Sequence, residues 1–179
     1  FNNQMDDFSK PGEPNHFGLS PSEDNFIAPG KRPLSSMSPS ILVAESLQGD
    51  VAADGSQQPI GRPKVWIVGG ASGGSRIITS TVQTILNVVG KGLDLLTALT
   101  TPRIHSQLIP FYTETEDTHE PYSLDIVAKQ STTDALLSRG HTVVAHNGEA
   151  NAQFIVVDPI TSELVGVSDP RKDGRPAGI

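Results

Sequence analysis

A strand-like run, a glycine-rich turn and a periodic segment follow one another between residues 64 and 92. The run "KVWIVGG" has the length and β-branched content of a strand, and "GGASGGSRI" separates it from "SRIITSTVQTILNVVGKG". Apolar residues recur in this last segment at three- and four-residue spacing, at Ile78, Val82, Ile85 and Val89. This spacing predicts a helix, and the glycines that follow are stop signals.

The other apolar runs predict further elements on both sides of this unit. Residues 38–44 form a short run that we expect to pair with 64–70 as a hairpin with a solvated connection. A second helix is predicted in 93–105, ended by Pro102, and a third in 123–140, with Ser123 as N-cap and Gly140 as stop. Strands are expected in 141–146, 152–159 and 162–170, the last two joined by a tight turn over 159–162.

The order of strands, then helices, then strands favours an α/β chain of the layered α+β type over repeated parallel βαβ units. A length of 179 residues with 36 % hydrophobic content predicts one domain with one core. Residues 1–34 are rich in Pro, Gly, Asn and Ser, which predicts a long loop. A loop of this length in a compact domain is usually functional.

Charge and composition exclude several classes of function. A formal charge of -7 and a pI near 5.1 argue against a nucleic-acid or anionic-membrane partner, because both require a basic surface. The absence of Cys excludes disulfides, thiolate metal sites and Cys nucleophiles. No apolar run approaches the roughly 18 residues of a membrane span, and no secretory leader is visible, so we expect any export or anchoring signal to lie outside these residues.

The glycine-rich turn is a candidate anion site, because backbone N–H groups converge where a strand passes into a helix. A phosphate is one candidate, but the P-loop pattern requires Lys followed by Ser or Thr, and Ser75 and Arg76 stand there. An oxyanion formed during acyl transfer is another, since two adjacent amides suffice for it. A tight turn without a ligand is the third interpretation.

Two further clusters could bind the two ends of an amino acid. Ser35 and Ser36 follow the cations Lys31 and Arg32 and could hold a carboxylate, or form an ordinary Ser-rich turn. The first residues of the chain could hold an ammonium group, or form a solvated turn; they include Asn2, Asn3, Gln4, Asp6 and Asp7. Together, these clusters suit an amino acid held by its α-end while its side-chain carbonyl is attacked.

Nothing in the sequence predicts a metal, a cofactor or a recognisable nucleophile. The acidic spacing fits no Ca²⁺ loop, and no pair of His has zinc spacing. We interpret the scattered histidines as surface or helix-end residues; they are His105, His119, His141 and His146. No G-x-S-x-G nucleophile elbow occurs.

Across nearly its whole length the chain resembles the small subunit of the γ-glutamyltranspeptidases, or glutathione hydrolases. The resemblance rests on "NNQMDDFS", "GKRPLSSMSPS", "GGASGGSRIITSTVQTILNVV", "TPRIHSQLIP" and "GVSDPR". It implies an N-terminal-nucleophile hydrolase with an αββα sandwich, present here in part, made as a precursor that cuts itself into two subunits. In that family an N-terminal Thr attacks the γ-glutamyl amide and its own α-amine is the base.

The resemblance also implies roles for individual residues. Gln4 and Asp7 would hold the substrate α-ammonium, and Ser35 and Ser36 its α-carboxylate. The Gly73 and Gly74 amides would hold the oxyanion, and "SKPGEPNHFGLSPSE" resembles a lid loop with Phe17 as its aromatic. Residues 1–34 would form the pocket wall and lid, and 35–179 the sheet and helices. Its partners would be the large subunit, glutathione and other γ-glutamyl compounds as donors, and amino acids or dipeptides as acceptors. The enzyme would lie outside the cytosol and would need no cofactor.

The chain also departs from the family pattern. It begins downstream of the catalytic Thr and of a substrate-binding Asn, and the large-subunit Arg that completes the carboxylate clamp is not in it. We therefore expect no turnover by this chain alone, and apolar surface left exposed where other strands belong. Two alternatives remain: an inert fragment, and a related acylase such as a cephalosporin acylase, against which Gln4 and Asp7 argue.

Overall fold

The structure is a computed structural model that describes residues 2–44, 64–119, 125–148, 150–158 and 161–178. Its first sheet has the strand order β1-β2-β7-β8, with every neighbouring pair antiparallel. The strands are β1 (Ser40–Ala44), β2 (Lys64–Ser72), β7 (Asn151–Val157) and β8 (Leu164–Ser168). The predicted pairing of 38–44 with 64–70 and the strands predicted in 152–159 and 162–170 are confirmed. The connection 45–63 and part of the turn 159–162 lie outside the described residues.

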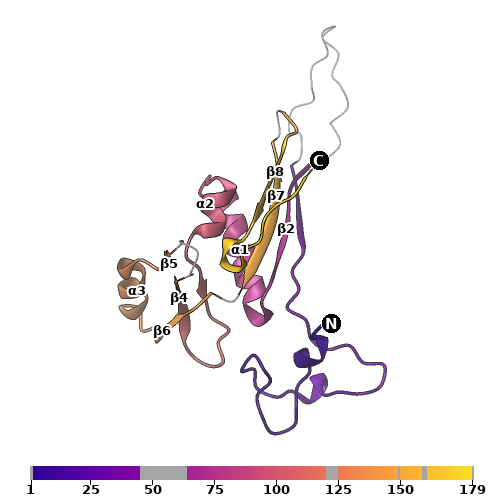
Figure 1. The fold of residues 1–179 in the computed structure, drawn as a ribbon. Helices are drawn as coiled ribbons and strands as arrows, with labels where there is room; N and C mark the ends of the chain where they lie inside the picture. The colour runs from indigo at the N-terminus through magenta and orange to yellow at the C-terminus, as the bar shows by residue number, and fades with distance from the viewer. Residues whose placement is uncertain (1, 45–63, 120–124, 149, 159–160, 179) are drawn as a thin grey trace, which may run out of the picture.

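Two helices cover one face of this sheet (Figure 1). They are α1 (Ile77–Val89), preceded by the 3₁₀ turn η3 (Gly74–Arg76), and α2 (Leu95–Thr100). The core between sheet and helices contains Ile67, Leu95, Leu99, Ala152 and Phe154. As predicted, α2 ends before Pro102, and Asp94 caps its first turn by accepting from the Thr97 amide at 3.0 Å.

Helix α1 buries a different face from the one that the apolar spacing predicts. Its buried residues are Ile77, Ser80, Thr81, Thr84 and Asn87, while Ile78, Val82, Leu86 and Val89 are 45–55 % exposed. Small polar residues let the helix approach closely, and Thr84 satisfies its hydroxyl by donating to the Ser80 carbonyl at 2.9 Å. Of the predicted stripe, only Ile85 packs against the core.

The uncovered face of the first sheet is also apolar. Side chains alternate across a strand, so Val68 and Ile155 point away from the core residues Ile67 and Phe154; they are 39 % and 42 % exposed. A groove of about 620 Å³ runs along residues of β2, β7 and β8. One sheet with helices on a single face is half of an αββα sandwich, and the expected exposed apolar surface is present.

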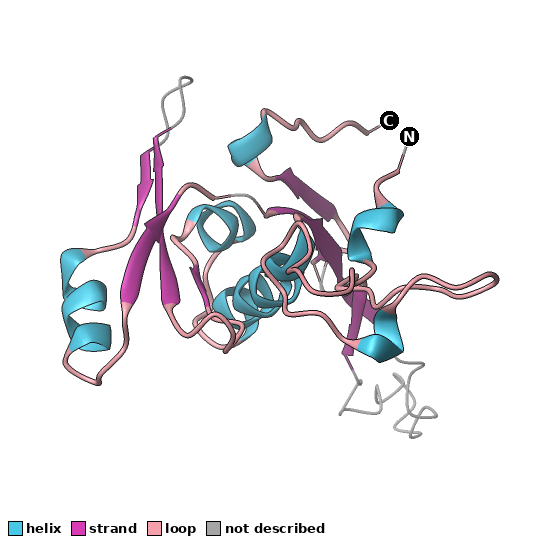
Figure 2. Ribbon diagram, turned by 90° about the horizontal axis from the view of Figure 1, so that it is seen from below, coloured by secondary structure: helices cyan, strands magenta, loops and turns pink. Residues whose placement is uncertain are grey.

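A second sheet lies on the other side of α1 and α2 (Figures 1 and 2); of its strands the sequence predicted the one in 141–146, which the structure confirms as Val143–His146. It contains β3 (Ile104–His105), β4 (Thr113–His119), β5 (Asp125–Val127) and β6 (Val143–His146), with β4 and β6 parallel. Helix α3 (Gln130–Leu137) packs against β6. The third helix was therefore predicted to begin too early: "DIV" is strand β5, Lys129 is the helix N-cap, and Ser123 lies outside the described residues.

Residues 2–34 contain only two short 3₁₀ turns, η1 (Gln4–Asp7) and η2 (Glu23–Asn25), as the Pro- and Gly-rich composition predicts. A last 3₁₀ turn, η4 (Pro170–Lys172), follows β8. The N-terminal segment lies at the end of the first sheet where β2 passes into α1 (Figure 1). No described helix is long and apolar enough to cross a membrane.

Candidate functional site

The turn between β2 and α1 requires glycine. Gly73 has φ 124° and Gly74 has φ 62°, values that side-chain-bearing residues rarely adopt. Both residues stand at the start of the helical run through η3 and α1, where the first N–H groups have no acceptor within the helix. The turn therefore offers backbone donors to an anion at a positive helix end.

Phe17 packs directly on this turn from the N-terminal loop. A Cβ atom at position 74 would overlap the Phe17 ring, so glycine is required there for space as well as for φ. The loop around Phe17 is folded by Asn15, whose Oδ1 accepts from the amides of Phe17 and Leu19, both at 3.0 Å. A long contact of 3.5 Å joins Gln107 Nε2 to the Phe17 carbonyl.

A cavity of about 420 Å³ lies next to Phe17 within the N-terminal segment. Of the predicted site residues, Asp7, Ser36 and Phe17 line it, whereas Gln4, Ser35, Gly73 and Gly74 do not. Phe17 touches both the cavity and the glycine turn, and so connects the two groups. Arg32, one of the two cations that precede Ser35 and Ser36, also lines the cavity. The polar lining residues to which the sequence assigned no role are Ser9, Asn15, Ser20, Ser22, Asp24 and Asn25.

Asp7 is the half-buried carboxylate of η1, and its neighbour Asp6 is exposed. Burial, and next the negative charge of Asp6, raise the pKa of Asp7 above its ordinary value of 3.8. A cation in the cavity would favour the ionised form of this carboxyl.

The glycine turn is fixed to the second sheet through an ion pair. Arg76 donates to both oxygens of Glu114, at 2.7 Å from Nε and 2.8 Å from Nη2. Burial alone would raise the pKa of Glu114, but the bonds and charge of Arg76 outweigh it and the pKa lies below its ordinary range. This bidentate pair sets the position of the residue that follows the turn.

His105 corrects one prediction, because it is buried rather than a surface or helix-end residue. Its Nδ1 lies 2.9 Å from Thr79 Oγ1 on α1, and its Nε2 lies 3.2 Å from Gln107 Oε1. A histidine with both nitrogens engaged in this way is a structural link between α1 and the 104–107 segment. Among the described residues no group of three or more His, Asp or Glu could hold a metal ion.

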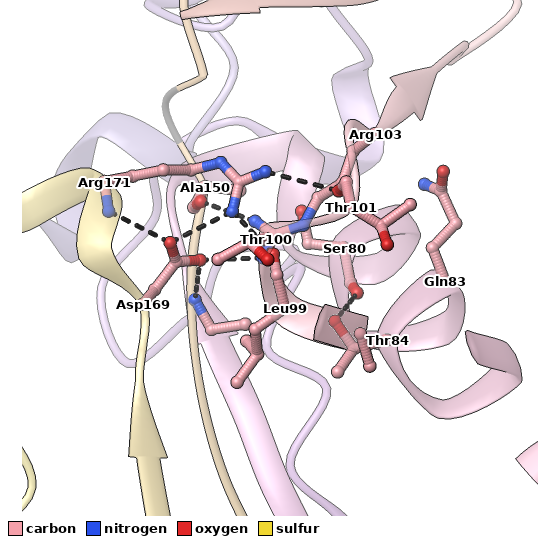
Figure 3. Close-up of polar contacts among 12 residues, drawn as sticks. Ser80, Gln83, Thr84, Leu99, Thr100, Thr101, Arg103, Ala150, Asp169 and Arg171 are labelled. Atoms are coloured by element: carbon pink, nitrogen blue, oxygen red, sulfur yellow. Dashed lines mark hydrogen bonds and ion pairs between the residues drawn. The ribbon is translucent and has the colours of Figure 1, made fainter. Parts of the chain in front are cut away.

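A buried ionic cluster joins residues from four segments of the chain, and Figure 3 shows its two arginines with Asp169 and Leu99. Arg103 donates to Asp169 Oδ2 at 2.7 Å, and Arg171 donates to Asp169 Oδ1 at 3.0 Å. Arg171 also pairs with both oxygens of Glu116, and both arginines donate to the Leu99 carbonyl. The cluster fixes the C-terminal end of α2 to β4 and to η4.

Asp169 also accepts from the Ala152 amide at 2.9 Å, which ties the cluster to β7. Burial would raise the pKa of Asp169, but the charges of Arg103 and Arg171 and the amide bond lower it overall. The sequence contains these residues in "TPRIH" and "SDPR", but no local pattern shows that they meet.

Comparison with known proteins points to one family. The family model described as Gamma-glutamyltranspeptidase matches residues 1–179. The glutathione hydrolase proenzyme of Escherichia coli K12 is 39 % identical over 171 residues, which are 95 % of this chain and 25 % of that protein. The chain spans about a quarter of the length of such curated relatives.

Solved structures have the same fold. The T380A mutant of Helicobacter pylori γ-glutamyltranspeptidase superposes with a TM-score of 0.75 at 35 % identity, covering 96 % of this chain and 81 % of that one. A cephalosporin acylase from Bacillus halodurans superposes less well, with a TM-score of 0.59 at 26 % identity, covering 87 % of this chain and 25 % of that one.

Proposed function

Because this chain belongs to the γ-glutamyltranspeptidase family, we propose that the protein of which it is part cleaves glutathione and other γ-glutamyl compounds. The γ-glutamyl group would pass to water or to amino-acid and dipeptide acceptors. The solved relatives are N-terminal-nucleophile hydrolases, and the sheet with helices on one face is part of that fold. The nucleophile would be a Thr outside these 179 residues, in a two-subunit enzyme outside the cytosol.

The observation that carries the proposal is the cavity that Asp7, Ser36 and Phe17 share beside the glycine turn. A carboxylate with a hydroxyl across the same cavity suits the ammonium and carboxylate of an α-amino acid. Gln4 would add a contact to the ammonium and Ser35 to the carboxylate. The lid assignment for Phe17 is supported by its position between the cavity and the turn.

In the proposed mechanism, the residues of this chain bind and stabilise rather than attack. With the donor held by its α-end, its γ-carbonyl would lie at the glycine turn. The amides of Gly73 and Gly74 would donate to the oxyanion that forms when the Thr attacks, and again when water or an amine attacks the acyl-enzyme. Arg76, bonded to Glu114, would keep these donors in place.

The experiment that tests this function is the release of p-nitroaniline from γ-glutamyl-p-nitroanilide, with and without glycylglycine. The complete self-cleaved protein is compared with residues 1–179 alone. We expect activity only in the complete protein, increased by glycylglycine. Activity in the isolated chain would place a nucleophile among these residues, and no activity in either would favour the acylase or the inert fragment. A glutaryl substrate identifies the acylase.

Replacing Asp7 by Ala in the complete enzyme should raise KM for γ-glutamyl donors about tenfold to hundredfold, with little change in kcat. The reason is the loss of a charge-assisted bond worth roughly 1.5–3 kcal/mol, which forms already in the ground state. Steady-state kinetics at neutral pH measure the effect. The matched control is Asp6→Ala, which removes the exposed neighbour; an unchanged KM in Asp7→Ala would exclude Asp7 from the site.

The acidity of Asp7 predicts a pH profile. The protonated carboxyl cannot pair with an ammonium, and the pKa of Asp7 in the free enzyme is raised above 3.8, so donor binding, measured as 1/KM, should fall with decreasing pH at a midpoint above 3.8. Asp6→Asn removes a negative neighbour and should move that midpoint to lower pH. Since burial is the larger cause, the midpoint should stay above 3.8. A midpoint unmoved by Asp6→Asn would contradict the coupling.

A further inference from the structure

The side chain of Asn25 joins three parts of the cavity wall. Its Nδ2 donates to the Asp7 carbonyl at 2.8 Å and to Ser9 Oγ at 3.3 Å. Its Oδ1 accepts from the Leu34 amide at 2.9 Å. Leu34 immediately precedes Ser35 in the chain. One amide group therefore connects the backbone of the proposed ammonium-binding residue with the backbone that leads into the proposed carboxylate-binding pair.

The backbone of Asn25 is fixed at the same place. Its carbonyl accepts from the Ser9 amide at 3.0 Å, and its own amide donates to the Ser22 carbonyl at 3.0 Å. Ser9 is buried, and its hydroxyl also accepts from the Ser22 amide at 3.3 Å. Between residues 2 and 34 no helix longer than one 3₁₀ turn and no strand is present to set the spacing of these segments. Asn25 supplies bonds that a sheet would otherwise supply.

We propose that Asn25 is a positioning residue that fixes the separation of Asp7 from Ser35 and Ser36, an inference that rests on the proposed function. A donor held at both its ammonium and its carboxylate needs that separation fixed to within about 0.5 Å. A donor without the ammonium uses only one end and does not depend on it. Asn25 therefore determines selectivity for α-amino-acid donors without touching the reacting carbonyl.

The test compares two donors in the complete self-cleaved enzyme: γ-glutamyl-p-nitroanilide, and glutaryl-p-nitroanilide, which lacks only the α-amino group. Asn25→Leu removes all three side-chain bonds at similar volume. We expect its KM for the γ-glutamyl donor to rise roughly tenfold, with kcat changed less than about twofold. The kinetics of the glutaryl donor should stay near those of the parent, so that the preference between the two donors shrinks by the same roughly tenfold factor.

Asn15→Leu is the matched control. Asn15 lines the same cavity and folds its loop through its side chain, but it bonds to Phe17 and Leu19 and does not bridge the two ends. The donor preference should survive this change. Asn25→Asp, which keeps the acceptor for the Leu34 amide and loses the donor to Asp7, should lower the preference in the same direction as Asn25→Leu.

Three results would overturn the proposal. The first is an unchanged donor preference in a folded Asn25 variant, and the second is an equal loss of donor preference in Asn15→Leu. The third is failure of both Asn25 variants to yield self-cleaved enzyme, which would make Asn25 a folding residue. A parent enzyme without any preference for the γ-glutamyl donor would instead reject the proposed function, so the two failures are distinguishable.

Discussion

Replacing Arg171 by Met in the complete protein is expected to lower the free energy of unfolding by about 3–5 kcal/mol. The Arg171 side chain has no exposed surface and pairs with Glu116 and Asp169, whose carboxylates are themselves buried. Removing one partner of such a pair leaves uncompensated charge in the interior. A loss of this size is a large part of the roughly 5–15 kcal/mol that holds a typical protein folded. Urea unfolding of parent and variant measures it.

The matched control is Lys172→Met, which removes the exposed neighbouring cation and should change stability by no more than about 0.5 kcal/mol. Arg171→Lys keeps the charge but loses the planar fork that reaches both carboxylates and the Leu99 carbonyl, so its stability should lie between those of parent and Met variant. A Met variant as stable as the parent would show that the cluster contributes nothing net.

Replacing Gly74 by Pro in the complete enzyme should lower kcat at least on the order of 10²- to 10³-fold, because it removes one proposed oxyanion donor and because proline, with φ fixed at about −65°, cannot keep the φ of 62° at this position. KM should change less, since the α-end of the donor binds elsewhere. Single-turnover formation of the acyl-enzyme measures the affected step. Normal kcat in a folded Gly74→Pro variant would reject the assignment.

Gly74→Ala separates the amide from the shape of the turn. Alanine keeps the N–H, but it is disfavoured at φ 62° and its Cβ would overlap the Phe17 ring. We expect a smaller loss of kcat than with proline, partly restored by Phe17→Ala, which makes room for the Cβ. Equal losses in Gly74→Ala and Gly74→Pro would attribute the effect to distortion of the turn rather than to the missing donor.

Much of the first sheet could be predicted because its signals are local. The run before the glycines, the turn and the start of α1 depend on neighbouring residues, and the structure confirms them. The buried face of α1 could not be predicted from apolar spacing, because close packing against the sheet selects Ser80, Thr81 and Thr84 instead of the larger side chains.

The strand β6 of the second sheet was predicted, but β4 was missed because its sequence, "TETEDTH", alternates Thr with acidic residues and lacks an apolar face. Its residues 113–116 and Thr118 are buried nonetheless, because arginines distant in sequence pair with its glutamates: Arg76 with Glu114 and Arg171 with Glu116. For the site, residue type pointed to Asp7 and Ser36, which line one cavity. Asn25 gave no such signal, because its role depends on contacts between three loop segments.

In the proposed site, the Asp7 end of the cavity recognises an α-ammonium group. The most direct test is the ratio of kcat/KM for γ-glutamyl-p-nitroanilide to that for glutaryl-p-nitroanilide, in the complete enzyme and in its Asp7→Asn variant. We expect the parent to prefer the γ-glutamyl donor by roughly tenfold to hundredfold and the variant to lose most of that preference. Equal rates with the two donors in the parent, or a preference that survives Asp7→Asn, would contradict this role of Asp7.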